Sequence, residues 1–258
     1  MLIALGTVLS LVKIVEMPYG GSVTTGSMLP LVILAYRHGT LRGLGAGLVY
    51  ATLQQLLGLN TLSYVTGWQS VVAVILLDYI IAFALVGLGG IFRRAFASQK
   101  SALVLGAVLV CVLRYVCHVI SGATVWKGLS IPTEAALIYS LGYNATYMIP
   151  EAIILAALTY YVGDAIDFTR DVPIRQRNGV FSKEASILPL ISGGVFLAGI
   201  ITDVCLIAPK LQDAETGAFT FSGLAEANWL AIGIITAAAV TVGVILLFIA
   251  KRNAHSEN

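Results

Sequence analysis

Long apolar runs separated by short polar stretches are the main pattern of this chain of 258 residues. Most runs approach the roughly 20 residues that an α-helix needs to cross a lipid bilayer. A membrane β-barrel would instead show alternating segments of about ten residues. Because backbone groups in lipid must bond within their own segment, the continuous runs predict helices. They cover residues 1–16, 25–38, 41–59, 68–92, 101–124, 134–164, 185–208 and 226–250.

Two of these runs carry local signals. The first ends without a small-residue cleavage site, so we expect a helix that is retained. The glycine-rich stretch 20–24 (Gly-Gly-Ser-Val-Thr) follows it. This stretch predicts a structured loop that dips toward the membrane and covers something. Pro150 interrupts the sixth run and predicts a kink there.

The composition changes near residue 165, where a polar and charged stretch begins. We interpret residues 166–184 as a cytoplasmic linker between a six-helix body, residues 1–165, and a two-helix appendage, residues 185–258. The predicted fold class is therefore an all-α, polytopic membrane protein. No sequence repeat relates the two halves, so the pattern does not favour an inverted-repeat transporter.

Composition agrees with a membrane protein: 58% of the residues are hydrophobic and 11% are charged, against about 25% charged in a soluble domain. With a net charge of +2, this excludes a soluble enzyme, a disordered chain and a nucleic-acid binder. We expect a multi-pass protein of the cell membrane, surrounded by lipid. If the N-terminus is cytoplasmic, 11 basic residues lie inside and 2 (Lys127 and Lys210) lie outside, which also predicts a cytoplasmic C-terminus. The inside set is Arg37, Arg42, Arg93, Arg94, Lys100, Arg170, Arg175, Arg177, Lys183, Lys251 and Arg252.

Ionisable side chains within spans are costly and are candidates for function. Each also has a structural interpretation. Lys13 can extend to the interface, Arg114 can pair with Asp78 or Glu151, and Asp203 can join two helices. The candidates are Lys13, Asp78, Arg114, His118, Glu151 and Asp203.

Several of these residues suit one kind of ligand if they converge. A carboxylate accepts from an amino group, aromatic faces attract a cation, and an amide donates and accepts. A flat, cationic, amine-bearing heteroaromatic molecule matches this set. Alternatively, Trp68 and Trp126 belong to the interfacial aromatic belt, and His118 is a bonded interior histidine. The converging set is Asp78, His118, Trp126, Tyr139 and Asn144.

Motifs for other chemistry are missing from the sequence. It contains no Walker loop, no HExxH and no GxSxG. The glycine-rich stretch 43–47 (GLGAG) lies inside an apolar run, where small residues let helices approach each other. We therefore predict no catalytic residues, no metal site and no cofactor.

Four sequence blocks resemble the thiamine-specific substrate-binding (S) component of energy-coupling factor (ECF) vitamin transporters. The resemblance covers about residues 1–165. It implies a six-helix protein that binds thiamine from outside, is not an enzyme, and is driven by a shared transmembrane coupling subunit and two ATPases. The blocks are MPYGGS (17–22) with MLP (28–30), LDY (77–79) with GLGGIFR (87–93), LRYVCHVISG (113–122) with Trp126, and YSLGYN (139–144) with YMIPE (147–151).

The resemblance also implies residue roles. Asp78 would bind the aminopyrimidine with Tyr79 beside it, and His118 and Trp126 would hold the thiazolium. The remaining ligand residues would be Gly122, which allows close approach, Tyr139 and Asn144, which complete the pocket, and Trp68, which flanks it. Gly6 and Ser10 would face the coupling subunit, because they fit the family's pattern of small residues four positions apart. Ala4 and Val8 fit this pattern less well.

This chain departs from the family in its carboxylate, because Asp78 stands where Glu is common. It also lacks a tryptophan in the first loop, where Tyr19 is the substitute we consider. Two other functions remain open at this point. One is uptake of a thiamine precursor or another heteroaromatic vitamin. The other is a membrane enzyme or sensor built on Asp78, Arg114, His118 and Glu151.

Overall fold

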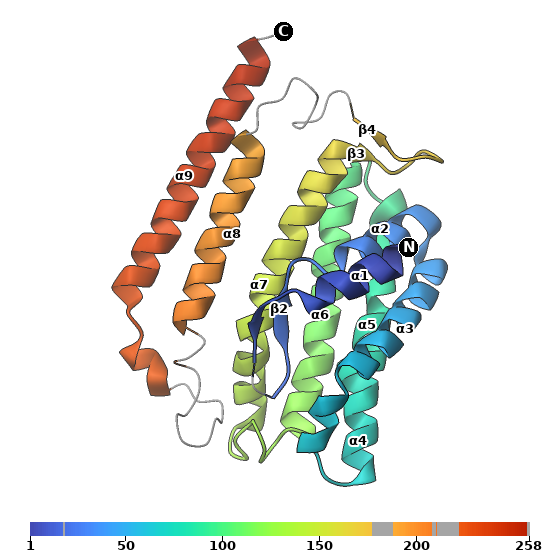
Figure 1. The fold of residues 1–258 in the computed structure, drawn as a ribbon, viewed down its shortest axis with the longest axis vertical. Coiled ribbons are helices and arrows are strands. Elements are labelled where there is room, and N and C mark those ends of the chain that lie inside the picture. Colours follow the sequence, from blue (N-terminus) through green and yellow to red (C-terminus); the bar gives the residue numbers. More distant parts are fainter. Residues whose placement is uncertain (18, 177–187, 208–209, 211–221, 257–258) are drawn as a thin grey trace.

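The computed structural model describes all residues except 18, 177–187, 208–209, 211–221 and 257–258. The fold is mostly helical, as predicted, and its centre is a pair of long packed helices, α6 (Gln99–Thr124) and α7 (Ala136–Ala165). Figure 1 shows shorter N-terminal elements on one side of this pair and two C-terminal helices on the other. The N-terminal helices are α1 (Leu2–Leu11), α2 (Leu29–His38) and α3 (Thr40–Leu57).

Four helical segments in the described part of the chain are long and apolar enough to cross a membrane. They are Trp68–Arg94, Gln99–Thr124, Ala136–Ala165 and Trp229–Leu246. The first is continuous but changes its winding, through α4 (Trp68–Val74), a π-helical stretch η2 (Ile75–Ile81), α5 (Ala82–Ala84) and the 3₁₀ segment η3 (Leu85–Arg94). The helical character of the prediction is thus confirmed, while the count of six plus two spans stays a prediction.

The prediction of an all-α chain is wrong in two places. Residues 1–16 are not one helix, because α1 ends at Leu11 and Lys13–Glu16 form strand β1. Strand β1 pairs antiparallel with β2 (Ser22–Thr24), so the expected folded loop is a β-hairpin. The β-branched pair Ile14 and Val15 between two charged residues suits a strand better than a helix.

The second difference lies in the predicted linker. Its first residues form the hairpin of β3 (Ile166–Asp167) and β4 (Ile174–Arg175), and residues 177–184 fall outside the described part. Gln99 at the start of α6 holds this hairpin, donating to Ile166 O (2.6 Å) and accepting from Phe168 N (2.8 Å). Arg37 donates to Asp171 O (2.9 Å), which gathers residues predicted as cytoplasmic at one end of the molecule.

Glycines bring the helices into close contact. A Cβ on Gly43 would meet Ala35, and one on Gly47 would lie 2.6 Å from Ala84 O. A Cβ on Gly87 would collide with the backbone at Gly43 and Leu44. The interpretation of the GLGAG stretch as a packing motif is therefore confirmed.

The two residues of α1 that were predicted to face a coupling subunit do not lie at the surface of the molecule. Gly6 and Ser10 are buried within the fold. A Cβ on Gly6 would lie 2.8 Å from Leu31, and Ser10 Oγ accepts from Gln54 Nε2 (2.8 Å). Spacing alone did not show which small-residue stripe faces inward. Ala4 and Val8 lie on the exposed side of α1 instead.

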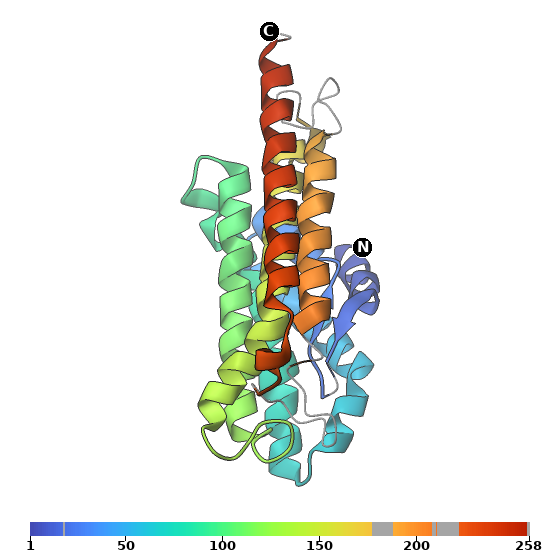
Figure 2. The same ribbon diagram turned by 90° about the vertical axis from the view of Figure 1, so that its left-hand side faces the viewer.

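The C-terminal helices α8 (Leu188–Ile207) and α9 (Trp229–Ser256) pack on each other, and α8 also contacts α7 and β1. A short 3₁₀ segment, η5 (Ser222–Glu226), precedes α9. Figure 2 shows α8 and α9 side by side along the outside of α7. Thr236 Oγ1 donates to Asp203 Oδ2 (2.6 Å), which confirms Asp203 as a helix–helix hydrogen-bonding residue.

Candidate functional site

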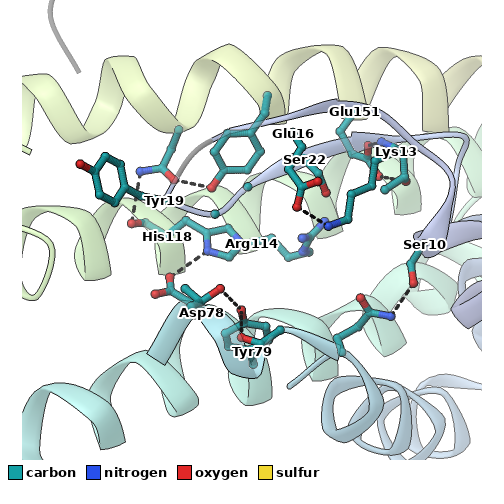
Figure 3. Close-up of a pocket in the computed structure, with 18 of the residues that line it drawn as sticks. Ser10, Lys13, Glu16, Tyr19, Ser22, Asp78, Tyr79, Arg114, His118 and Glu151 are labelled. Atoms are coloured by element: carbon teal, nitrogen blue, oxygen red, sulfur yellow. Dashed lines mark hydrogen bonds and ion pairs between the residues drawn. The ribbon is translucent and has the colours of Figure 1, made fainter. Parts of the chain in front are cut away.

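A cavity of about 310 Å³ lies between the β1–β2 hairpin and the helices α3, η2, α6 and α7. This volume is at the lower end of the usual range for small-molecule sites. Figure 3 shows Asp78 and His118 facing each other at one part of the wall, with Arg114 pointing between His118 and Glu151. Six of the eight predicted ligand residues line it: Asp78, Tyr79, His118, Gly122, Trp126 and Asn144.

The carboxylate of Asp78 is the hub of the hydrogen bonds in this wall. Its Oδ1 lies 3.0 Å from His118 Nδ1, while Oδ2 accepts from Ser121 Oγ (2.6 Å) and Trp126 Nε1 (3.1 Å). These bonds join the π-helical stretch η2 to the C-terminal end of α6 and the residues after it. A π-helical turn within an α-helix often marks a functional site. An ionised carboxylate has about four acceptor sites, so one is left for a ligand.

Tyr79, the next residue of the π-helical stretch, anchors it to the end of α3. Its hydroxyl donates to Thr61 Oγ1 (3.0 Å) and lies 3.2 Å from Gly58 O. A Cβ on Gly58 would overlap the Tyr79 ring, so glycine at the end of α3 permits this contact. Tyr79 therefore ties α3 to the cavity wall while its ring remains part of the lining.

Helix α7 supplies the amide of the wall. Asn144 Nδ2 donates to Ser140 O (2.9 Å), and Asn144 Oδ1 accepts from Tyr147 Oη (2.5 Å). Gly122 of α6 lies opposite, where a Cβ would meet Ser140 Oγ and come within 3.3 Å of Asn144 Nδ2. At Gly122 the structure shows a close approach between α6 and α7, while close approach of a ligand there stays a prediction.

Trp68 and Tyr139 are not brought to the cavity. Trp68 is 72% exposed at the first residue of α4, in keeping with the interfacial-belt interpretation. Tyr139 precedes Asn144 by five residues, which places it about 140° away around α7. Neither residue lines the cavity.

Comparison with known proteins decides the family. The family described as "Thiamine transporter protein (Thia_YuaJ)" matches residues 1–166. This chain belongs to that thiamine transporter family. It is similar to the thiamine transporter ThiT of Bacillus subtilis (strain 168), with 39% identity over 150 residues. The aligned part is 55% of this chain and 74% of the relative. Family membership and the apolar helices make it a multi-pass membrane protein.

The match to the thiamine transporter family ends where α7 passes into β3. The whole cavity therefore lies within the matched residues, and helices α8 and α9 lie beyond them. The division that we predicted at residue 165 is close to this boundary.

Arg114 has a different environment in this family member from the one predicted. No ion pair within 4.0 Å joins Arg114 to Asp78 or Glu151 in the described part of the chain, so the expected pair is wrong. Its guanidinium lies 4.3 Å from the centre of the Phe83 ring, and Nη1 lies 2.9 Å from Met28 Sδ. Lys13 pairs with Glu16 at the rim, on strand β1 rather than on a helix.

Sequence reasoning missed several residues of this thiamine transporter's cavity. Ser121 does not line the cavity but supports its wall by donating to Asp78. It carries no charge and stands in the block 113–122 without a role of its own, although it follows His118 by three residues on one helix face. Tyr143 and Tyr147 line the cavity itself. Their spacing with Glu151 (residues 143, 147 and 151) was the available signal, because side chains four apart share a helix face.

Proposed function

We propose that this chain is the membrane-embedded thiamine-binding subunit of an ECF-type ABC transporter. It captures thiamine from outside for ATP-driven uptake by its partner subunits and has no catalytic role of its own. The observation that carries the proposal is the cavity wall of Asp78, His118, Trp126 and Asn144 within a chain of the thiamine transporter family. Orientation with both termini cytoplasmic is part of the proposal.

The wall matches both rings of thiamine. The remaining acceptor site of Asp78 takes the amino group of the aminopyrimidine, a charge-assisted bond. The indole of Trp126 and the ring of His118 provide π-faces for the thiazolium. Tyr79, Gly122 and Asn144 complete the proposed contact set. The rings of Trp68 and Tyr139 lie outside it, so we place neither against thiamine.

Partner docking is proposed on the exposed side of α1. The coupling subunit would contact α1 on the exposed side that carries Ala4 and Val8, where the small side chain of Ala4 allows a second helix to approach closely. Gly6 and Ser10 then support α1 from within by packing it on α2 and α3.

A thiamine titration of the purified full-length chain, followed by tryptophan fluorescence, tests the proposed ligand. We expect saturable quenching that shrinks in Trp126→Phe. Asp78→Ala should weaken binding about 10- to 100-fold, the cost of one charge-assisted hydrogen bond. Asp203→Ala, which removes a membrane carboxylate that does not line the cavity, should change affinity less than about twofold.

Equal losses of thiamine affinity in Asp78→Ala and Asp203→Ala would contradict the proposed binding site. Absence of quenching by a folded wild-type chain would contradict thiamine as the ligand. The same titration would then be run with the free aminopyrimidine and a panel of heteroaromatic vitamins.

A further inference from the structure

The β1–β2 hairpin rests on one stripe of α7. Tyr143, Tyr147 and Glu151 follow one another at intervals of four residues, so they lie on one helix face over about 12 Å. Tyr143 Oη donates to Gly20 O (2.8 Å) in the turn of the hairpin. The next contact is at Gly21 and the last is at Thr24. The stripe thus contacts the hairpin from its turn to its open end.

The contact at Thr24 is made by a buried carboxyl group. Glu151 is 3% exposed, and its two oxygens accept from Thr24 N (2.6 Å) and Thr24 Oγ1 (2.7 Å). No basic side chain forms an ion pair with it in the part of the chain that the structure describes. A buried carboxyl group is costly unless it is hydrogen-bonded. The hairpin supplies the bonds that Glu151 needs.

Tyr147 connects this stripe to the ligand wall. Gly21 has φ +90°, and a Cβ there would lie 2.6 Å from the Tyr147 ring, so only glycine lets the hairpin lie against it. Tyr147 also bonds Asn144 and meets the His118 ring edge-on, with 6.1 Å between ring centroids. A displacement of the hairpin therefore changes the surroundings of two ligand residues.

We propose that Glu151 is a positioning residue that holds the β1–β2 hairpin closed over the cavity and thereby sets how fast the bound ligand leaves. This inference rests on the proposed thiamine-binding function. Each oxygen of Glu151 accepts one bond from Thr24, which ties α7 to the hairpin. Glu151 also lines the cavity, so the experiments below separate an effect through the hairpin from direct contact with the ligand. Thr24 pairs with Lys13 across the hairpin, so the bond fixes both strands at their open end.

Stopped-flow thiamine binding to the full-length chain separates this role from direct ligand contact. Glu151→Ala should raise the dissociation rate about tenfold and change the association rate constant less than about threefold. Glu151→Gln keeps an acceptor for Thr24 N and gains a donor toward Thr24 Oγ1, so it should restore near wild-type dissociation. Asp203→Ala is the matched control and should dissociate like the wild type.

A second variant tests whether Glu151 acts on the ligand through Thr24 of the hairpin. Thr24→Val removes one of the two bonds and should raise the dissociation rate less than Glu151→Ala does. In the Glu151→Ala background it should add less than it does alone, because its bond to Glu151 is already lost and only its bonds to Ser27 remain to be removed. Additive effects of the two substitutions on the dissociation rate would contradict the latch, by which we mean the contact of Glu151 with Thr24 that holds the hairpin on α7. If Glu151→Gln and Glu151→Ala raised the dissociation rate equally, Glu151 would be assigned to direct contact with the ligand. If neither variant changed the dissociation rate, the proposed role of Glu151 would be wrong.

A measurement without ligand distinguishes failure of the latch from failure of the proposed function. A cysteine introduced at Ser22, on the cavity side of β2, is labelled with a water-soluble maleimide, with the unsubstituted chain as background. Labelling should be several-fold faster when Glu151→Ala is added. If the wild type bound no thiamine but labelling accelerated, the ligand assignment would fall and the latch would stand. Unchanged labelling would overturn the latch.

Discussion

Under the proposed function, the carboxylate of Asp78 has two tasks in this cavity. It offers an acceptor to the ligand, and it fixes the donors around it, because Trp126 Nε1 and Ser121 Oγ both bond its Oδ2. Loss of the carboxylate therefore removes one ligand bond and frees the indole that forms the aromatic face. Hydrogen-bonded groups of this kind act together, and their losses are not additive.

Gly122 offers a sharper test of the α6–α7 contact at the site. Gly122→Ala puts a methyl group against Ser140 Oγ and near Asn144 Nδ2, and overpacking of this kind costs about 1–3 kcal/mol. We expect thiamine to bind about 10- to 100-fold more weakly, because Asn144 must move. Titration of the variant measures this, with Gly45→Ala as the control, since a Cβ on Gly45 meets nothing within 4 Å. Unchanged affinity in Gly122→Ala would show that Asn144 does not contact thiamine.

The convergence of Asp78, His118, Trp126 and Asn144 was accessible from the sequence for a physical reason. Charged or amide groups in apolar spans are costly, so they stand out and must find partners. Ser121 and Tyr147 gave no such signal, because a serine or tyrosine in a membrane helix is unremarkable. Arg114 was misread because its partner is an aromatic face, Phe83, rather than a carboxylate.

At the scale of elements, the π-helical stretch Ile75–Ile81 and the β1–β2 hairpin position the site. Apolar periodicity located the span that contains η2, but it does not reveal a local change of winding within an apolar run. The sequence pattern did not predict the hairpin as a pair of strands, because its stability comes from side chains that are distant in the sequence. Its bonds reach across 127 residues from Thr24 to Glu151, a distance that no local pattern encodes.

The β3–β4 hairpin carries a pH dependence of its own. Hydrogen bonds from the Thr169 hydroxyl and backbone N–H, and a weaker one from Arg170, hold the pKa of Asp167 below its usual range. The ionised form is favoured in the folded hairpin. Its contribution to stability is therefore present above the ordinary aspartate pKa of about 3.9 and disappears as pH falls through the lowered value.

We therefore expect the Thr169 amide to lose protection from hydrogen exchange below about pH 4, after correction for the intrinsic exchange rate. Hydrogen exchange of the full-length chain in detergent measures this. Asp167→Asn cannot ionise and should show little pH dependence in the same range. Equal pH dependence in both proteins would assign the effect to another group.

At the scale of the whole molecule, the family match and the fold divide the chain at the same place. The cavity lies entirely within residues 1–166, and α8 and α9 form a separate pair that touches this body through α7 and β1. The distribution of basic residues between alternate loops gave the predicted orientation, and the contact of Arg37 with Asp171 brings together two of the segments predicted as cytoplasmic. The proposed function assigns this chain a binding site, and a binding site alone supplies no energy for uptake.

Reconstitution into vesicles tests this last point. The chain alone should bind thiamine in a fixed ratio to protein without accumulating it. Accumulation should require the coupling subunit, both ATPases and ATP, because a partner must change the affinity of the site between two states. Ala4→Phe, on the exposed side of α1, should abolish accumulation while leaving thiamine affinity within about twofold of the wild type, since Ala4 does not line the cavity. Accumulation by the chain alone under an ion gradient would contradict the ECF mechanism and assign it a secondary transport mechanism instead.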